Sequence, residues 1–319
     1  MKKCFLILLF SVFILTSCSQ KKYSTQFYGY FDTIVSIEGY FDSEEDFNKA
    51  SNIVIETLKE YDTLLDIHDN GDLKSLNEAR SIEVKPELSN VLKFGIEAEN
   101  ITKGYCNIAM GKVFQLWHEA READVPYLPT FESLKAASKH SDITSIKAEG
   151  NTVTLENEIL IDTGAIAKGY VSDILRKRLT NAGFDNMYVN LGGNVVVIGN
   201  KDGKGWNVGI RNPMSDSGIA DMVSATDSCL VTSGNYQRYF EYEGKKYHHI
   251  ISPDTLYPSD LYLSVTVLYE NGAWADALST ALFNMSLEEG KEVLSRFKNI
   301  GVMWITAENE YIYYGTLKK

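Results

Sequence analysis

Apolar residues recur along this chain with two different periods. From residue 47 to residue 65 they return every three or four positions behind Ser43 and Asp46, a pair that resembles a capping box, so the pattern predicts a helix ending near Leu65. The same period predicts helices at residues 87–102, 111–121, 165–182, 273–285 and 287–297, with a shorter helix from Phe131. Short apolar or alternating runs predict strands at residues 31–37, 143–148, 152–155, 187–190, 195–198, 206–210, 239–242, 246–251 and 264–268, and two more at the end of the chain. Because the two kinds of element mix without regular alternation and without an obvious linker, we expect an α+β fold in which residues 27–319 form one unit.

The N-terminus has the pattern of a targeting segment. Two lysines precede an almost wholly apolar run at residues 5–15, which is shorter than the ~20 residues that a helix needs to span a bilayer. Small residues then precede Cys18, as in a bacterial lipobox. We therefore expect residues 1–17 to be a lipoprotein signal peptide, Cys18 to carry the lipid, and residues 18–26 to be a polar tether. An ordinary secretory signal with a chance cysteine is the alternative.

Charge and cysteine content narrow the possible functions. The formal charge is −12, with 43 acidic and 31 basic residues, which argues against a partner made of nucleic acid. Removing residues 1–17 takes away two lysines and no acidic residue, so the charge becomes −14. Of the four cysteines, that cleavage and the lipid leave Cys106 and Cys229, which an oxidising compartment would allow to pair if they are close.

Two segments contain small residues where backbone and ligand can approach closely. In residues 161–170 a strand ends at Asp162 and a helix opens through Gly164 with Lys168 in its first turns, an arrangement that favours phosphate. A tight strand–helix turn with an exposed lysine is the structural alternative. Residues 190–194, with two adjacent glycines, lack the spacing of a dinucleotide fingerprint and are typical of a hairpin or bulge.

The predicted helix at residues 273–285 carries three oxygen donors on one patch. Asp276 and Thr280 are four residues apart and share a helix face, with Ser279 beside them. Such a set suits a hard cation such as Mg²⁺, which keeps waters and binds phosphates alongside. The alternative is an aspartate that serves as a cap and hydroxyls that bond to the helix backbone.

Two adjacent histidines, His248 and His249, fall on a predicted strand and should face opposite sides of it. At least one of them has the pattern of a structural residue. Neither has the spacing of a zinc ligand with another histidine or cysteine.

Together these segments resemble the ApbE family of extracytoplasmic FAD:protein FMN transferases, over nearly the whole mature chain. Six ordered elements carry the resemblance. They are D-x-G-x-x-A-K-G at residues 162–169, N-L-G-G-N at 190–194, W-x-V-G-I-x-x-P at 206–213, S-G-x-Y-x-R at 233–238, H-I-I-D-P near 249–253 and A-D-x-L-S-T-A at 275–281.

The resemblance implies a T-fold-like α+β domain that binds FAD and Mg²⁺ and transfers FMN to a threonine or serine hydroxyl of an acceptor protein, releasing AMP. It also implies a place on the periplasmic face of a bacterial membrane. The implied metal ligands are Asp276, Thr280, the Ala165 carbonyl and Ser279. The implied FAD contacts are Phe31, His68, Ala109, Met110, Gly111, Asp162, Lys168 and Ile250. His249 is the first candidate for the general base that takes the acceptor proton, and Asp162 is the second.

The chain departs from the family pattern beside His249. Ser252 replaces the usual aspartate, Leu256 replaces a glycine, and His248 stands where serine is common. Two alternative hypotheses therefore stand beside the predicted transferase activity. One is a hydrolase that cleaves FAD to FMN and AMP, and the other is a non-catalytic flavin-binding lipoprotein.

Overall fold

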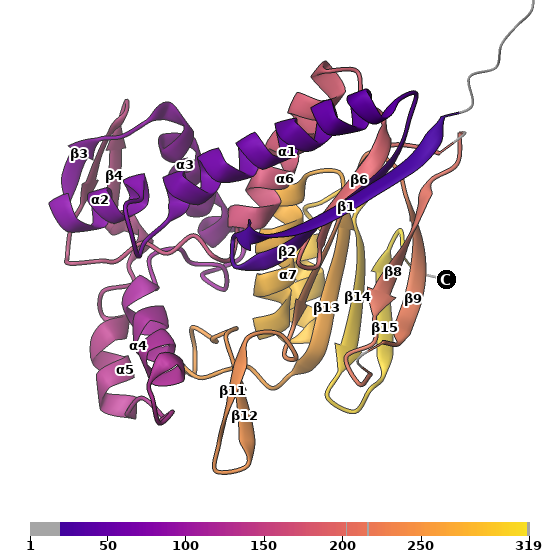
Figure 1. Ribbon diagram of the computed structural model, residues 1–319. Coiled ribbons are helices and arrows are strands. Elements are labelled where there is room, and N and C mark those ends of the chain that lie inside the picture. The colour runs from indigo at the N-terminus through magenta and orange to yellow at the C-terminus, as the bar shows by residue number, and fades with distance from the viewer. Residues whose placement is uncertain (1–19, 202, 216, 318–319) are drawn as a thin grey trace, which may run out of the picture.

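A central antiparallel sheet of eight strands organises the molecule (Figure 1). The computed structural model describes residues 20–201, 203–215 and 217–317. The strand order is β1-β2-β6-β7-β10-β13-β14-β15, and each neighbouring pair is antiparallel. The strands are β1 (Lys21–Tyr30), β2 (Thr33–Phe41), β6 (Asn186–Leu191), β7 (Asn194–Gly199), β10 (Cys229–Gly234), β13 (Tyr262–Tyr269), β14 (Gly301–Thr306) and β15 (Tyr311–Gly315).

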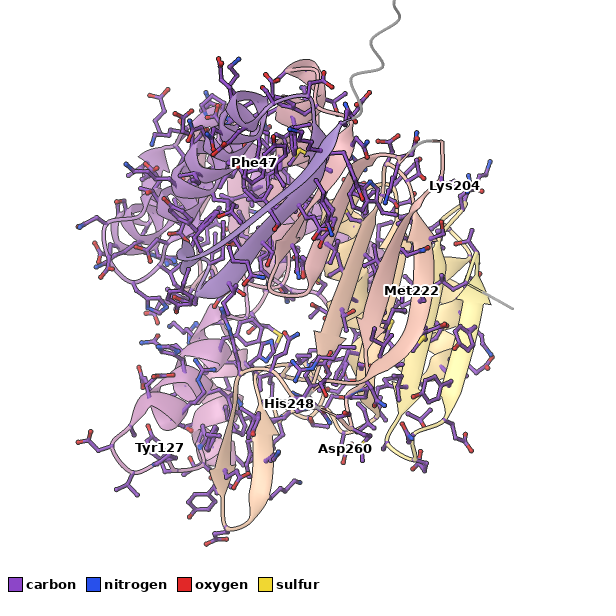
Figure 2. The ribbon with its side chains drawn as sticks, turned by 45° about the vertical axis from the view of Figure 1, so that its right-hand side comes forward. Phe47, Tyr127, Lys204, Met222, His248 and Asp260 are labelled. Carbon is purple, nitrogen blue, oxygen red and sulfur yellow. The ribbon has the colours of Figure 1, made fainter. Side chains whose placement is uncertain are left out.

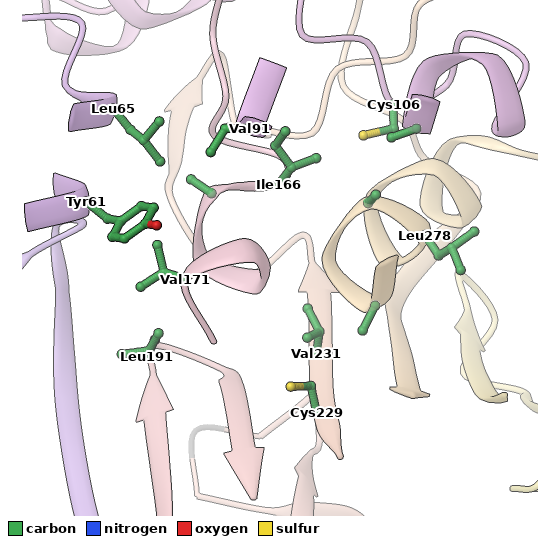
Figure 3. Packing of buried hydrophobic residues seen from close by; sticks show 14 of the residues in the cluster. Tyr61, Leu65, Val91, Cys106, Ile166, Val171, Leu191, Cys229, Val231 and Leu278 are labelled. Carbon is green, nitrogen blue, oxygen red and sulfur yellow. The ribbon is translucent and has the colours of Figure 1, made fainter. Parts of the chain in front are cut away.

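Helices cover one face of this sheet and make the main core with it. They are α1 (Glu44–Leu65), α6 (Ala167–Asn181), α7 (Gly272–Asn284) and α8 (Leu287–Leu294). Figure 3 shows Tyr61 of α1 beside Val171 of α6, and Leu278 of α7 and Val231 of β10 belong to the same buried cluster. Because side chains alternate along a strand, Leu230 points to the opposite face, where it joins a second apolar cluster.

A two-stranded ribbon covers that opposite face. It consists of β8 (Trp206–Arg211) and β9 (Ile219–Ala225), which pair with each other and not with the central sheet. Trp206, Val208 and Ile210 of β8 point inward and pack on Leu230 and Met303 of the sheet. The element W-x-V-G-I-x-x-P therefore builds a cover for the sheet.

Smaller units flank the helical side. Figure 1 shows one group at the end of α1, and the hairpin β11–β12 projecting beside α4 and α5. The first group consists of β3 (Ser81–Glu83), β4 (Ile146–Glu149), β5 (Thr152–Leu155), α2 (Asp72–Ala79), α3 (Pro86–Ile101) and the short helix η1 (Ile143–Ser145). The second consists of α4 (Gly111–Glu122), α5 (Phe131–Ser138), β11 (Tyr239–Tyr242) and β12 (Lys245–His248). Trp117 of α4 packs on Phe240 and Tyr247 of the hairpin.

The α+β expectation is confirmed, with several differences in detail. The strand expected at residues 31–37 is wrong at its start, because Phe31 and Asp32 form the β1–β2 turn with φ of 51° and 48°. The tether expected at residues 18–26 is wrong from Lys21 onward, where β1 pairs with β2. The predicted signal peptide at residues 1–17 and Cys18 lie outside the described residues.

Elements missing from the prediction include α2, β3, β9 and β10. Other boundaries moved by a few residues: α6 begins at Ala167, and β12 ends before His249. Gly183 ends the α6 region with φ of 87°, as expected of a C-terminal cap.

Cys106 and Cys229 are free thiols, and both are buried. Burial raises the pKa of each thiol well above its usual range, so both stay protonated. Among the described residues, no helix is long and apolar enough to cross a membrane.

Candidate functional site

The first part of the site is a very close crossing of α6 and α7. A Cβ added to Gly169 of α6 would lie 2.2 Å from the Gly272 carbonyl oxygen and 2.4 Å from Asp276 Cβ. A Cβ added to Gly272 would lie 2.7 Å from the Gly169 oxygen. Asp173 of α6 secures the crossing, because its carboxylate accepts the N–H groups of Gly272 and Ala273 at 2.9 and 3.0 Å. Glycine at both positions lets the two backbones touch.

This crossing places Asp276 of α7 beside the start of α6. Gly169 is the third residue of α6, so its N–H has no partner within the helix, and it donates to Asp276 Oδ2 at 2.7 Å. Within the described part of the chain, neither the Ala165 carbonyl nor Asp276 Oδ1 has a hydrogen-bond donor. Two oxygens of the kind that binds a hard cation are therefore available at this end of α6.

The Asp276 carboxylate is buried at 4% exposure, and burial raises its pKa. The positive charge of Lys168 acts in the opposite direction. Asn194, at the β6–β7 turn, also lies close enough to lower this pKa, yet its Nδ2 is buried and makes no hydrogen bond. Asn194 is therefore a near neighbour of Asp276, with an amide N–H group free to bond to a ligand.

The hydroxyls on α7 differ in their environments. Ser279 is fully buried, donates to the Asp276 carbonyl at 2.9 Å and lies 2.9 Å from Ser233 Oγ of β10. Thr280 is half-buried, and no hydrogen bond involves its hydroxyl among the described residues. Thr280 is therefore the freer of the two donors.

Asp162 lies beside residues 109–111. Met110 and Leu160 form a parallel bridge, Gly111 N–H donates to the Leu160 carbonyl at 3.0 Å, and Asp162 N–H donates to the Ile108 carbonyl at 2.9 Å. Asp162 Oδ1 accepts the Gly164 N–H at 2.7 Å, which shapes the turn into α6. Burial raises the pKa of Asp162, although its side chain keeps some solvent-accessible surface.

Phe31 reaches the same region from the other side of the chain. Its N–H donates to Asp62 Oδ1 of α1 at 2.8 Å, and its carbonyl accepts from Arg238 Nη2 at 2.9 Å. Arg238 in turn lies close enough to Asp162 and His249 to lower the pKa of both groups. The Arg238 guanidinium therefore contacts the β1–β2 turn, and its charge also acts on Asp162 and His249.

His249 follows β12 directly, and its side chain is exposed to solvent. Surrounding protein nevertheless lowers its pKa to about 3, with Lys168, Arg238, His248 and Arg121 contributing in the same direction. An accessible imidazole crowded by protein is typical of a concave site. The His249 imidazole is neutral near pH 7 and able to take a proton.

The predicted flavin-pocket residue His68 is exposed and stacks on His118 of α4, with ring centroids 5.1 Å apart. Arg121 Nη2 lies 2.9 Å from His118 Nδ1, and both imidazoles lie close enough to Asp162 to affect its pKa. The two stacked imidazoles of His68 and His118 form a flat polar surface beside Asp162. His118 gave no signal in the sequence, because nothing there pairs α4 with the segment around His68.

The loop after His249 explains the three departures from the family pattern. His248 is buried and structural, with Nε2 2.7 Å from the Ser259 carbonyl and Nδ1 accepting the Ile250 N–H at 3.2 Å. Ser252 Oγ accepts the Asp254 N–H at 3.3 Å, a role that an aspartate can also fill. Ile250 is buried within the main core cluster.

Leu256 keeps the backbone conformation that favours glycine. Its φ is 63°, its N–H donates to the Ser252 carbonyl at 2.8 Å, and its carbonyl accepts from Trp117 Nε1 at 2.9 Å. Its side chain is buried in the same cluster as Trp117 and Phe240. Packing of the leucine therefore offsets a strained backbone.

This arrangement predicts an inverted order of stability at position 256. Leu256→Ala loses the buried side chain and keeps the strain, whereas Leu256→Gly loses the side chain and releases about 1 kcal/mol of strain. We expect Leu256→Gly to be the more stable variant by about 1 kcal/mol in chemical denaturation. At Leu134, a helical residue of the same cluster, the alanine variant should be the more stable one. A lower stability of the glycine variant at 256 would contradict this account.

Three of the predicted segments are thus brought together, and two contributors were missed. Residues 162–169, Asp276 with Thr280, and His249 converge, with Phe31 and His68 at the margin. The sequence pattern gave no role to Asp173, which caps α7 from another helix. Arg238 was visible as part of S-G-x-Y-x-R, but its contacts depend on the chain folding back to the β1–β2 turn.

Known proteins share both this fold and these sequence elements. An FAD:protein FMN transferase of Vibrio cholerae is 33% identical over 231 residues, which cover 70% of this chain and 69% of the relative. A second, from Klebsiella pneumoniae, is 27% identical over 266 residues, covering 81% and 83%.

Among solved structures, the ApbE protein of Thermotoga maritima superposes with a TM-score of 0.84 at 26% identity, covering 94% of this chain and 100% of the other. The flavin transferase ApbE of Vibrio cholerae gives 0.78 at 26% identity, covering 93% and 98%. The model of the ApbE family matches residues 31–304, which contain every element described above from Phe31 to Thr280. With fold, motifs and site geometry in agreement, the chain belongs to the ApbE family.

Proposed function

We propose that this protein transfers FMN from FAD to a serine or threonine hydroxyl of an acceptor protein and releases AMP. The relatives named FAD:protein FMN transferase support the reaction. The observation that carries it for this chain is the bond from the Gly169 N–H to Asp276, which fixes the carboxylate at the start of α6, where the Ala165 carbonyl accepts no hydrogen bond in the described residues and the charge of Lys168 acts on Asp276.

The residues present fit a Mg²⁺ ion. Asp276, the Ala165 carbonyl and Thr280 would hold it, because each offers an oxygen and the Ala165 carbonyl and the Thr280 hydroxyl make no hydrogen bond in the described residues. Ser279 already bonds within the protein and would orient Asp276. The described residues contain no cluster of three histidine, cysteine or acidic side chains, which agrees with a hard cation that keeps waters and phosphate oxygens as ligands. When bound, the ion supplies Lewis-acid stabilisation of the phosphate oxygens.

The chain's own groups do the rest of the chemistry. Lys168, whose charge acts on both Asp276 and His249, would bind phosphate oxygens of FAD. His249 is neutral, so it can accept the proton of the attacking hydroxyl, while Asp162 shapes the turn and faces the nucleotide. The acidic net charge of −12 makes these local cations more important for binding an anionic substrate.

One assay separates transfer from its alternatives. The full-length protein is incubated with FAD, Mg²⁺ and a protein carrying the family's Asp-containing Ser/Thr-Gly acceptor motif, and covalent flavin is read by in-gel fluorescence. We expect a fluorescent acceptor and an equal amount of AMP. FMN and AMP without labelling would indicate a hydrolase, and bound, unchanged FAD would indicate a carrier.

We also propose a lipid anchor on Cys18 at the extracytoplasmic face of a bacterial membrane, on the lipobox-like pattern before it. Cys18→Ala should move the protein from the membrane fraction to the soluble fraction without loss of transferase activity, because Cys18 precedes β1 and is none of the residues assigned to the site. Cys4→Ala is the matched control and should leave the protein on the membrane. Membrane retention of the Cys18 variant would contradict lipidation.

A further inference from the structure

Arg238 lies where three separate segments of the chain meet. It precedes β11, it bonds to the β1–β2 turn, and its charge acts on Asp162 and His249. Its φ is 37°, a left-handed conformation that costs free energy for a residue with a side chain. The fold therefore holds this side chain at the site against a backbone preference.

The guanidinium has unused donors and an unneutralised charge. Of its five N–H donors, Nη2 supplies those that reach the Phe31 carbonyl at 2.9 Å and the Asp32 carbonyl at 3.3 Å. Nε and Nη1 make no hydrogen bond, and no carboxylate pairs with Arg238, in the ranges that the structure describes. Arg121, by contrast, is bonded to Glu122 and His118.

Lys168 is the other cation with these properties. It has no ion pair with a carboxylate in the described residues, and its charge also lowers the pKa of His249. Two cations that make no direct ion pair thus act on one neutral imidazole, while Lys168 also acts on Asp276 and Arg238 on Asp162. That arrangement favours a ligand with more than one negative charge between them.

We propose that Arg238 binds a phosphate oxygen of FAD together with Lys168, and that it holds the β1–β2 turn with Phe31 against the bound nucleotide. The inference rests on the proposed function and deepens it. One face of the guanidinium fork would bind the anion, while Nη2 keeps its bonds to the turn carbonyls. FAD binding and the position of Phe31 would then depend on the same side chain.

Two substitutions separate charge from hydrogen bonding. Arg238→Lys keeps the charge but cannot reproduce the fork, whereas Arg238→Gln keeps an amide donor for the turn carbonyls and loses the charge. Lys246→Gln is the matched control. It removes a cation from the β11–β12 hairpin, where the Lys246 ammonium packs on the Tyr239 ring. The dissociation constant of FAD is measured by flavin fluorescence for each full-length protein in Mg²⁺ without acceptor, and thermal melts verify folding.

We expect Arg238→Lys to bind FAD within about fivefold of the unmodified protein and Arg238→Gln to bind about 10- to 100-fold more weakly. Lys246→Gln should stay within about twofold. Equal affinities for the lysine and glutamine variants would overturn the proposal, whether both are weak or both unchanged. The proposed function is tested separately, with the unmodified protein. Binding of FAD and labelling of an acceptor would support that function even if the role of Arg238 were refuted. Absence of FAD binding in the unmodified protein would refute the function itself.

Discussion

Asp276→Asn should lower FMN transfer by about 10³-fold or more, because it removes the single carboxylate in the set that would hold Mg²⁺. The variant should still fold, since Asn has nearly the same shape and burying a carboxylate costs free energy. The prediction is tested by measuring transfer rates together with unfolding in the presence and absence of Mg²⁺.

The pH dependence of stability provides a second measurement of the effect of Asp276→Asn. Burial raises the pKa of Asp276 in the folded state above the value of 3.8 for a free side chain. The native protein therefore prefers the protonated form, and stability should fall as the pH rises through the raised pKa in the absence of metal. Asp276→Asn does not titrate, so its stability should exceed that of the unmodified protein increasingly above about pH 4.

Mg²⁺ should reverse the difference in stability between the unmodified protein and Asp276→Asn. It should raise the melting temperature of the unmodified protein and have little effect on Asp276→Asn. Asp173→Asn is the matched control, because Asp173 is a half-buried carboxylate with a raised pKa on the adjoining helix, yet it is bonded to Gly272 and Ala273. That variant should lose stability and keep its response to Mg²⁺. Full activity of Asp276→Asn would eliminate the proposed metal site.

Gly169→Ala should destabilise the protein by about 3 kcal/mol or more, although alanine normally favours a helix. The added Cβ would lie 2.2 Å from the Gly272 carbonyl oxygen, which is backbone and can move only if α6 and α7 separate. Separation would also break the bond from Gly169 N–H to Asp276. We therefore expect loss of transfer activity together with the loss of stability in chemical denaturation.

A glycine in α8 provides the comparison. The nearest atom to a Cβ on Gly290 is the end of the Leu282 side chain at 2.9 Å, which can shift. Gly290→Ala should stay within about 1 kcal/mol of the unmodified protein and keep its activity. A Gly169→Ala variant as stable as Gly290→Ala would show that the helices do not need their close contact.

The sequence pattern predicted the class of the fold well and the edges of the sheet poorly. Strong periodicity identified α1 and α7, because each buries a continuous apolar face. β1 was mistaken for a tether because it is an edge strand, half-exposed and rich in polar residues. β10 was missed because its six residues run from apolar to hydroxyl-bearing without alternation, as a strand covered on both faces does.

The candidate site also contains residues that the sequence predicts and contacts that it cannot predict. Asp276 and Thr280 were recognisable from helical spacing alone, since both lie on one element. The bond between Gly169 and Asp276 joins residues 107 positions apart, so local patterns contain no trace of it. Leu256 shows the reverse case, in which leucine stands where the family pattern has glycine and the backbone still has a left-handed conformation that favours glycine.

The strand β1 sets a limit on where this enzyme can work. It starts at Lys21, three residues after the proposed lipid attachment, and ends one residue before the turn that carries Phe31. A fully extended chain from residue 18 to residue 31 spans at most about 45 Å. A protein anchored at Cys18 would therefore reach only hydroxyl groups that stand within a few nanometres of the bilayer, which favours acceptors that are themselves held at that membrane.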